Sequence, residues 1–130
     1  MSEKVKILIV DDSQAILDAE EEILKETGLQ ILRATTGREA LKKMITDKPA
    51  VVLLDLVLPD IQGDAIIQYV RNRNDIKDTP IIVVTAKGEE EGLARCFKAG
   101  CDAYVTKPVD REDILEKVKI LLAEKGIYIE

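Results

Sequence analysis

Three short runs of hydrophobic residues recur along the chain. They cover residues 5–10, 50–54 and 81–84, and each is rich in valine, isoleucine and leucine. Continuous hydrophobic runs of this length are typical of strands that are buried on both faces, as in a parallel sheet covered by helices. Residues 29–34 and 102–106 mix polar and hydrophobic positions, so we predict that they form the two edge strands.

Between these runs, hydrophobic residues recur at three- and four-residue spacing, which indicates amphipathic helices. The stripes expected to face the sheet are Ile16, Ala19 and Ile23; Ala40, Leu41, Met44 and Ile45; Ile66, Ile67 and Val70; Leu93, Cys96 and Phe97; and Ile114, Val118, Leu121 and Leu122. Thr36 followed by Glu39 is a capping-box pattern, and Asp110 can cap the last helix. Gly100 is expected to end a helix, and the acidic residues 89–91 to form the solvated start of one.

The predicted order is a strand followed by a helix, repeated five times. Right-handed crossovers place helices on both faces of the sheet, and the mixed strands at the edges favour the strand order 2-1-3-4-5. We therefore predict an α/β, doubly wound, flavodoxin-like fold in which a five-stranded parallel sheet is flanked by five helices. Residues 1–130 are expected to form one domain, because only residues 125–130 follow the last helix, too few for an output domain.

Composition narrows the chemistry that the chain can perform. It has 130 residues, no histidine and two cysteines, which excludes a Ser-His-Asp triad, a Cys-His pair and a histidine-based zinc site within this chain. A net charge of −6 and a pI of about 4.8 argue against contacts to nucleic-acid phosphates. One phenylalanine and three tyrosines are too few for a surface that stacks bases. We therefore expect no direct nucleic-acid partner.

The sequence shows no signal for a membrane. No hydrophobic run approaches the roughly 18 residues of a membrane span, and the start of the chain lacks the hydrophobic stretch of a secretory leader. We expect a cytoplasmic location without membrane insertion. Cys96 and Cys101 are then expected to be reduced, packed thiols.

Charged and hydroxyl residues stand where the predicted strands end. Asp11 and Asp12 follow the first strand, Asp55 the third, Thr85 the fourth and Lys107 the fifth. The carboxyl ends of parallel strands share one edge of the sheet, so three carboxylates would meet there beside a lysine and a hydroxyl. Carboxylates this close repel each other unless a cation neutralises them, and an all-oxygen donor set favours Mg²⁺. The sequence therefore predicts a Mg²⁺ site.

Carboxylates, Mg²⁺, a lysine and a hydroxyl together suit a phosphoryl group. Mg²⁺ and Lys107 would neutralise its oxygens, Thr85 would donate a hydrogen bond, and a carboxylate could attack phosphorus. The chain has no Walker A loop, so a bound nucleotide is not the expected phosphodonor.

These residues resemble the receiver domain of two-component response regulators, of the chemotaxis-regulator-like single-domain kind, over essentially the full chain. The matching motifs are Asp11-Asp12; the D-x-x-x-P-x-x-x-G pattern from Asp55 through Pro59 to Gly63; Thr85-Ala86; and Tyr104-Val105-Thr106-Lys107-Pro108. Each motif alone is common. Their joint order is specific, because each one stands at the end of a predicted strand and the spacings are those usual in the family.

The resemblance implies a phosphoacceptor and a set of metal ligands. Asp55 would be the nucleophile that accepts a phosphoryl group from a phosphohistidine of another protein. Asp12, Asp55 and the Val57 carbonyl would bind Mg²⁺ directly, and Asp11 would bind it directly or through water. The absence of histidine then points to an external phosphodonor, which is a histidine kinase or a histidine phosphotransfer protein.

The same resemblance implies residues that bind the phosphoryl group and respond to it. The contacts would come from Lys107, Ala86 and Val57. The peptide bond before Pro108 would be cis. Thr85 would move to hydrogen-bond the phosphoryl group, and Tyr104 would turn inward into the space behind it. This movement would change the face of the fourth helix, fifth strand and fifth helix, where a downstream protein target would bind.

We therefore expect a phosphorylation-activated switch that is not an enzyme beyond catalysing its own phosphorylation and dephosphorylation. A phosphorelay intermediate, or the receiver of a hybrid kinase that passes the phosphoryl group to a histidine phosphotransfer protein, fits the same residues. An alternative of another class is an aspartate-based phosphatase of haloacid-dehalogenase type. It requires a second acid two residues after the nucleophile, where this chain has Val57.

Overall fold

The computed structural model describes residues 4–129, along which five strands alternate with five α-helices. The strands are β1 (Lys6–Val10), β2 (Gln30–Ala34), β3 (Val51–Asp55), β4 (Ile81–Thr85) and β5 (Ala103–Thr106). The helices are α1 (Gln14–Leu24), α2 (Gly37–Asp47), α3 (Gly63–Arg71), α4 (Glu90–Ala99) and α5 (Arg111–Glu124), and a short 3-10 helix, η1 (Lys25–Thr27), follows α1. Each strand lies within one residue of its predicted bounds.

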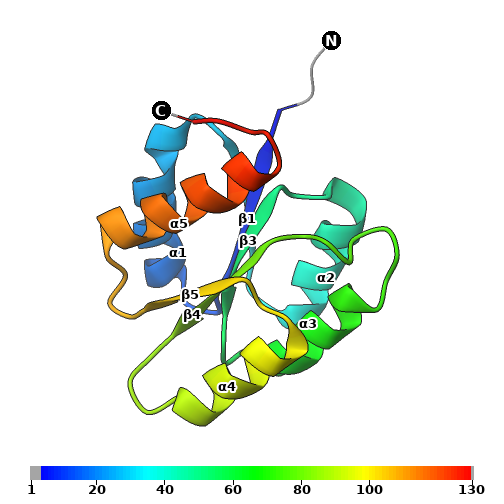
Figure 1. The fold of residues 1–130 in the computed structure, drawn as a ribbon. Helices are drawn as coiled ribbons and strands as arrows, with labels where there is room; N and C mark the ends of the chain where they lie inside the picture. Colours follow the sequence, from blue (N-terminus) through cyan, green and yellow to red (C-terminus); the bar gives the residue numbers. More distant parts are fainter. Residues whose placement is uncertain (1–3, 130) are drawn as a thin grey trace.

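The five strands form one parallel sheet in the order β2-β1-β3-β4-β5, which confirms the predicted fold and its edge strands. Figure 1 shows the twisted sheet between two groups of helices. Val10 pairs with Leu54 in the register of β1 and β3, so these two strands end side by side. The chain runs from β1 to β2 on one side and then returns to add β3, β4 and β5 on the other side. Ligand sites in folds of this type form at the carboxyl ends of the two strands where this order reverses, which here are β1 and β3.

Alternate side chains of the inner strands enter two hydrophobic cores. Leu8 and Val52 pack on the side covered by α2, α3 and α4, whereas Ile7 and Leu53 face α1 and α5 (Figure 1). Every residue of β3 and β4 is buried, which explains why these strands are continuous hydrophobic runs in the sequence. The predicted stripes of α3 and α5 are confirmed as buried faces.

Three helix ends have the caps that the sequence predicts. The Thr36 hydroxyl accepts a hydrogen bond from the Glu39 N–H at 3.1 Å, and the Asp110 carboxylate accepts one from the Asp113 N–H at 3.0 Å. Gly100 ends α4 with a φ of 112°, a left-handed conformation that favours glycine. These caps set where α2 and α5 begin and where α4 ends.

The buried face of α1 differs from the predicted stripe. Leu17, Glu20 and Leu24 are buried, whereas Ala19 is exposed and Ile16 and Ile23 are only partly buried. This face buries two leucine side chains, which removes more apolar surface from water than a face centred on Ala19 would. The same rotation of the helix carries the carboxyl group of Glu20 into the interior.

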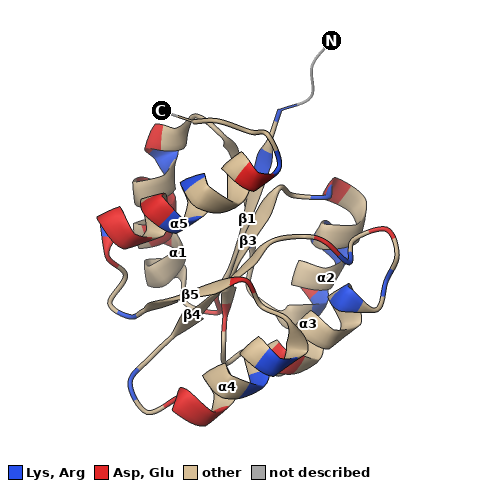
Figure 2. Cartoon of the chain, in the orientation of Figure 1, with Lys and Arg blue, Asp and Glu red and all other residues tan. Residues whose placement is uncertain are grey.

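Charged residues cover the outside of the molecule. Figure 2 shows acidic residues at the start of α4 and of α5, where they interact favourably with the helix dipoles. Among residues 4–129, no helix is both long enough and apolar enough to cross a membrane.

Candidate functional site

The carboxyl ends of β1 and β3 bring three aspartates together. Asp11 and Asp12 directly follow β1, and Asp55 is the last residue of β3. One carboxylate oxygen of each lies within 4.8 Å of the others. Asp11 is 1% exposed and Asp55 4% exposed, whereas Asp12 lies on the solvent side. The end of the sheet therefore gathers three acidic groups, two of them buried.

Hydrogen bonds from the backbone hold Asp11 in place. Its N–H donates to the Ala34 carbonyl at 3.1 Å, and its Oδ1 accepts from the Ser13 N–H at 2.9 Å. Its Oδ2 is buried and has no hydrogen-bond partner among residues 4–129, although it lies 3.2 Å from Lys107 Nζ. One carboxylate oxygen of Asp11 thus accepts a backbone hydrogen bond, and the other faces the ammonium group of Lys107.

Lys107 reaches the aspartates from the end of β5. Its N–H donates to the Thr85 carbonyl at 2.8 Å, and its Nζ lies 3.3 Å from Asp55 Oδ1 as well as close to Asp11. The Lys107–Pro108 peptide bond is cis, as the resemblance implied. A single ammonium group therefore bridges the two buried carboxylates.

Burial and charge shift the ionisation of this cluster. Burial, followed by repulsion from Asp11, raises the pKa of Asp55 to about 6. Burial lowers the pKa of Lys107, but attraction to Asp55 and Asp11 outweighs that effect and the pKa is raised. Lys107 therefore stays protonated at neutral pH, and Asp55 is ionised above about pH 6.

The donor set fits a hard divalent cation. Three carboxylates meet one ammonium group, which leaves negative charge uncompensated, and carboxylate oxygens are donors that Mg²⁺ prefers. Within residues 4–129, the only group near the buried Oδ2 of Asp11 that an ion pair records is the Lys107 ammonium at 3.2 Å, so one positive charge is shared between two buried carboxylates. Val57 lies at the edge of the cluster, where its N–H donates to Asp55 Oδ1 at 3.4 Å and its side chain is 58% exposed.

The end of β4 brings a hydroxyl to the same edge of the sheet. Thr85 is its last residue and is 4% exposed. The Thr85 hydroxyl donates to Glu89 Oε1 at 3.2 Å, and the Ala86 N–H donates to the same oxygen at 2.7 Å. Glu89, expected on a solvated face, instead contacts two residues of the predicted site.

Tyr104 lies on the surface of β5. Its ring is 42% exposed and packs edge-on against Phe97, with the ring centroids 5.9 Å apart. Phe97 is 45% exposed, so its predicted place on the buried face of α4 is wrong, whereas Cys96, predicted on the same face, is buried. A cavity of about 360 Å³ lies beside Thr85, Tyr104 and Lys107.

Glu20 is a buried carboxyl group near the cluster that the sequence analysis did not identify. It is 1% exposed, and neither of its side-chain oxygens has a hydrogen-bond partner among residues 4–129. Burial, followed by repulsion from Asp11, raises its pKa to about 8, so it is largely neutral at pH 7. The signal in the sequence is its position between Leu17 and Leu24, at helical spacing from both.

The fold and the site together define a class of signalling domain. The sequence matches the family "response regulator receiver domain" over residues 7–119. The chain therefore belongs to this family, whose members are receiver domains of two-component response regulators.

Similar proteins agree with this assignment. The chain is 34% identical over 122 residues to the alkaline phosphatase synthesis transcriptional regulatory protein PhoP of Bacillus subtilis, covering 94% of this chain and 50% of that protein. It is 38% identical over 117 residues to the transcriptional regulatory protein SrrA of Staphylococcus aureus, covering 90% and 47%. The chain thus spans about half the length of these curated relatives. A solved CheY-like receiver domain protein from Methanospirillum hungatei has a TM-score of 0.86 and 35% identity, covering 95% of this chain and 98% of that one.

Proposed function

We propose that this chain is a signalling switch that accepts a phosphoryl group on Asp55. The observation that carries the proposal is the position of Asp55, buried beside Asp11 and Asp12 with Lys107 Nζ 3.3 Å from its Oδ1. A carboxylate nucleophile, an acidic set for Mg²⁺ and a fixed ammonium group are the parts that phosphoryl transfer to a carboxylate requires. Membership of the receiver family, together with valine at position 57, speaks against the phosphatase alternative.

In the proposed reaction, a carboxylate oxygen of Asp55 attacks the phosphorus of a phosphohistidine. The bond between phosphorus and the imidazole nitrogen breaks, and its electron pair returns to the imidazole. Mg²⁺ bound by Asp11, Asp12, Asp55 and the Val57 carbonyl would supply positive charge to the phosphoryl oxygens. Lys107 keeps its proton and places a second positive charge beside Asp55, which stabilises the transferred group. The chain would catalyse only this transfer and the later hydrolysis.

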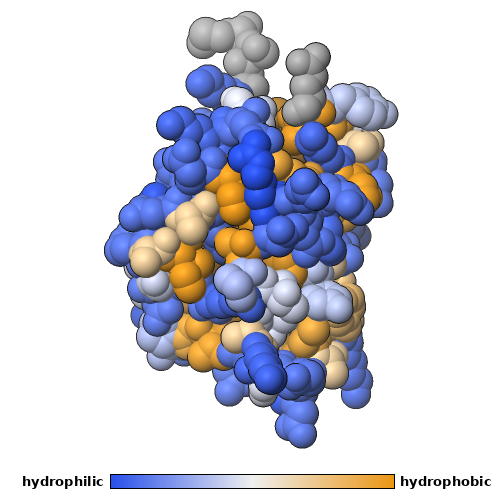
Figure 3. Space-filling view, turned by 90° about the vertical axis from the view of Figure 1, so that its left-hand side faces the viewer, coloured by the Kyte–Doolittle hydropathy of each residue, from blue (hydrophilic) through white to orange (hydrophobic). Residues whose placement is uncertain are grey.

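The phosphodonor is proposed to be a histidine kinase or a histidine phosphotransfer protein, because this chain has no histidine. An apolar surface beside the lysine suits contact with such a protein. It is a shallow cavity lined by Ala15, Ile16, Ala19, Lys107, Pro108 and Val109. Figure 3, which views the molecule from the side of α1 and α5, shows exposed hydrophobic side chains among hydrophilic ones. A helix docked there would bring its histidine to the mouth of the site.

The response is proposed to pass through Thr85 and Tyr104. Thr85 and the Ala86 N–H would bind the phosphoryl group, and Tyr104 would leave Phe97 and fill the cavity beside Thr85. A downstream protein would then bind the altered face of α4, β5 and α5. The proposal concerns the receiver part, since the relatives named as transcriptional regulators are about twice as long as the matched segment. A phosphorelay role would use the same residues, and no contact favours it over the switch.

Intact-mass measurement tests the central claim. The protein is incubated with Mg²⁺ and acetyl phosphate, with and without EDTA, beside the matched variant Asp55→Asn. We expect one phosphoryl group on the wild type, none in EDTA and none on Asp55→Asn. An unmodified wild type, or an adduct that persists in Asp55→Asn, would overturn the proposal.

A further inference from the structure

The carboxylate of Glu89 occupies the two donors that the phosphoryl group would need. Its Oε1 accepts from the Ala86 N–H at 2.7 Å and from the Thr85 hydroxyl at 3.2 Å. The hydroxyl has a second possible acceptor, the Ala86 carbonyl, but at 3.5 Å this contact is longer. One internal oxyanion thus holds an N–H and an O–H that face the same edge of the sheet as Asp55.

Glu89 also joins these donors to the start of α4. It is the N-cap residue: its N–H donates to the Ala86 carbonyl at 3.2 Å, and its carbonyl accepts from the Leu93 N–H at 3.0 Å. Together with the side-chain contact, these bonds close the turn between residues 86 and 89. Any movement of the carboxylate therefore acts on the first turn of the helix.

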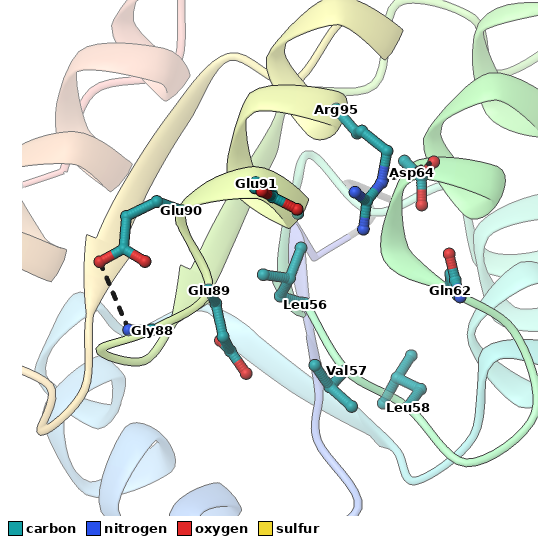
Figure 4. A pocket seen from close by; sticks show the side chains of 11 residues that line it. Leu56, Val57, Leu58, Gln62, Asp64, Gly88, Glu89, Glu90, Glu91 and Arg95 are labelled. Atoms are coloured by element: carbon teal, nitrogen blue, oxygen red, sulfur yellow. Dashed lines mark hydrogen bonds and ion pairs between the residues drawn. The ribbon is translucent and has the colours of Figure 1, made fainter.

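The two neighbouring glutamates do not share this arrangement. Figure 4 shows the side chains of Glu89, Glu90 and Glu91 leaving the start of α4 in different directions. Among residues 4–129, the carboxylate of Glu90 accepts a hydrogen bond from the Gly88 N–H alone, at 3.4 Å (Figure 4). Glu90 therefore carries the same charge at the same helix end and lines the cavity beside Thr85 and Ala86, but no hydrogen bond joins its carboxylate to either residue in the described part of the chain, which makes it a matched control.

We propose that Glu89 is an internal competitor of the phosphoryl group and holds the switch in its resting arrangement. The inference rests on the proposed function of Asp55. A carboxylate and a phosphoryl group are both oxyanions, so they bind the same donors and repel each other when close. Phosphorylation would therefore have to displace Glu89 from Thr85 and Ala86. The start of α4 would lose its side-chain tether in the same step.

If Glu89 competes with the phosphoryl group, removing its carboxylate should change the affinity for a phosphoryl analogue differently than if Glu89 only caps the helix. If Glu89 competes, removing its carboxylate frees both donors, and a phosphoryl analogue binds more tightly. If it only caps α4 or positions Thr85, removal leaves the affinity unchanged or weakens it. The loss of hydrogen bonds made by a charged acceptor corresponds to roughly a tenfold change in affinity.

Titration with beryllofluoride in the presence of Mg²⁺ separates these possibilities. The affinity of wild type, Glu89→Ala and Glu89→Gln is measured by calorimetry at constant ionic strength, with Glu90→Ala as the control for loss of charge. We expect Glu89→Ala to bind about tenfold more tightly, Glu89→Gln to bind more tightly by a smaller factor because its amide oxygen can still accept, and Glu90→Ala to resemble the wild type. The amide resonance of Ala86 reports the displacement directly, and beryllofluoride should move it in the wild type.

The outcomes distinguish this inference from the function on which it rests. If the wild type neither binds beryllofluoride nor becomes phosphorylated, the proposed function of Asp55 fails. If the wild type does both but Glu89→Ala and Glu89→Gln bind no more tightly than the wild type, Glu89 does not compete. An equal gain in Glu90→Ala would assign the effect to charge at the helix start and would also overturn the inference. Circular dichroism of each variant checks that α4 and the rest of the fold are retained.

Discussion

Two buried carboxyl groups of this molecule, Asp55 and Glu20, differ in what neutralises them. Asp55 is 4% exposed and has Lys107 Nζ 3.3 Å from its Oδ1. Glu20 is 1% exposed and has neither an ion pair nor a hydrogen bond from its side chain within residues 4–129. Burial is the largest cause of the raised pKa in both, yet the pKa is about 6 for Asp55 and about 8 for Glu20. At neutral pH the first is an anion and the second mostly a neutral acid.

The comparison shows how hydrogen bonds from a nearby cation and an N–H keep one buried carboxyl group ionised, whereas a buried carboxyl group without them stays neutral. A carboxylate must be ionised to act as a nucleophile. The ammonium group of Lys107 and the backbone N–H of Val57 donate hydrogen bonds to the ionised form of Asp55. Glu20 is also attracted by Lys107, but it accepts no hydrogen bond within residues 4–129, and burial outweighs the attraction. The first two predictions below test this difference, and the third tests how the site responds to a group bound at Asp55.

Replacing Glu20 by a residue that cannot ionise is expected to have the largest effect of the three, a change in how stability depends on pH. Its pKa is raised from 4.5 to about 8, so its contribution to stability is fully present below pH 4.5 and is lost as the pH rises toward 8. Relative to Glu20→Leu, the wild type should lose a few kcal/mol, by order of magnitude, of unfolding free energy across that range. Urea titrations without Mg²⁺, at several pH values between these limits, measure the difference.

Glu20→Gln is the matched control for this prediction. It keeps the size and polarity of the side chain but cannot ionise, so its stability should follow the pH profile of Glu20→Leu. Wild-type and variant profiles that run parallel would show that Glu20 has no raised pKa.

Replacing Lys107 by alanine should make Asp55 more like Glu20. Without the ammonium group, the pKa of Asp55 rises above its value of about 6, and the transferred group loses a positive charge. We expect phosphorylation by acetyl phosphate to slow about 10²-fold and the pH dependence of its rate to move to higher pH. Rates from intact mass across the pH range measure both effects, with the exposed Lys119→Ala as the charge control. Equal rates in wild type and Lys107→Ala would refute the role of the lysine.

Removing the hydroxyl of Thr85 should have the smallest effect on the chemistry. Thr85→Val keeps the shape of the side chain but loses one hydrogen bond, which is worth about 1 kcal/mol, or roughly fivefold in affinity. The rate of phosphorylation should therefore change little, whereas the movement of Tyr104 should be lost. The ring resonances of Tyr104, recorded before and after phosphorylation, measure that movement. A Thr85→Val protein in which Tyr104 still responds would contradict the proposed route.

The sequence was sufficient to predict the sheet and the cluster of acids. Continuous hydrophobic runs required strands covered on both faces, and residues that follow parallel strands must share one edge. The sequence therefore predicts that Asp11, Asp55 and Lys107 lie together, and the structure confirms that placement. Their chemical roles remain predictions.

The rotation of helices about their axes was harder to predict. The choice between a face with Ala19 and one with Leu17 and Leu24 depends on packing against the sheet, and that choice determines whether Glu20 is buried. The contact of Glu89 depends on the turn between residues 86 and 89, which precedes α4, so the hydrophobic periodicity of the helix does not predict it. Both features arise from tertiary geometry rather than from periodicity.

Both ends of the described chain lie where the strands begin, at the opposite end of the sheet from the aspartates. Lys4, Lys6, Lys125 and Ile127 line one shallow cavity there, and Figure 1 shows β1 running from this edge toward the site. The five residues of β1 alone separate the two edges by about 16 Å. A fluorescent reporter or a surface tether attached near Lys4 or Ile127 would therefore lie away from the aspartates, which suits single-molecule measurements of the proposed phosphorylation reaction.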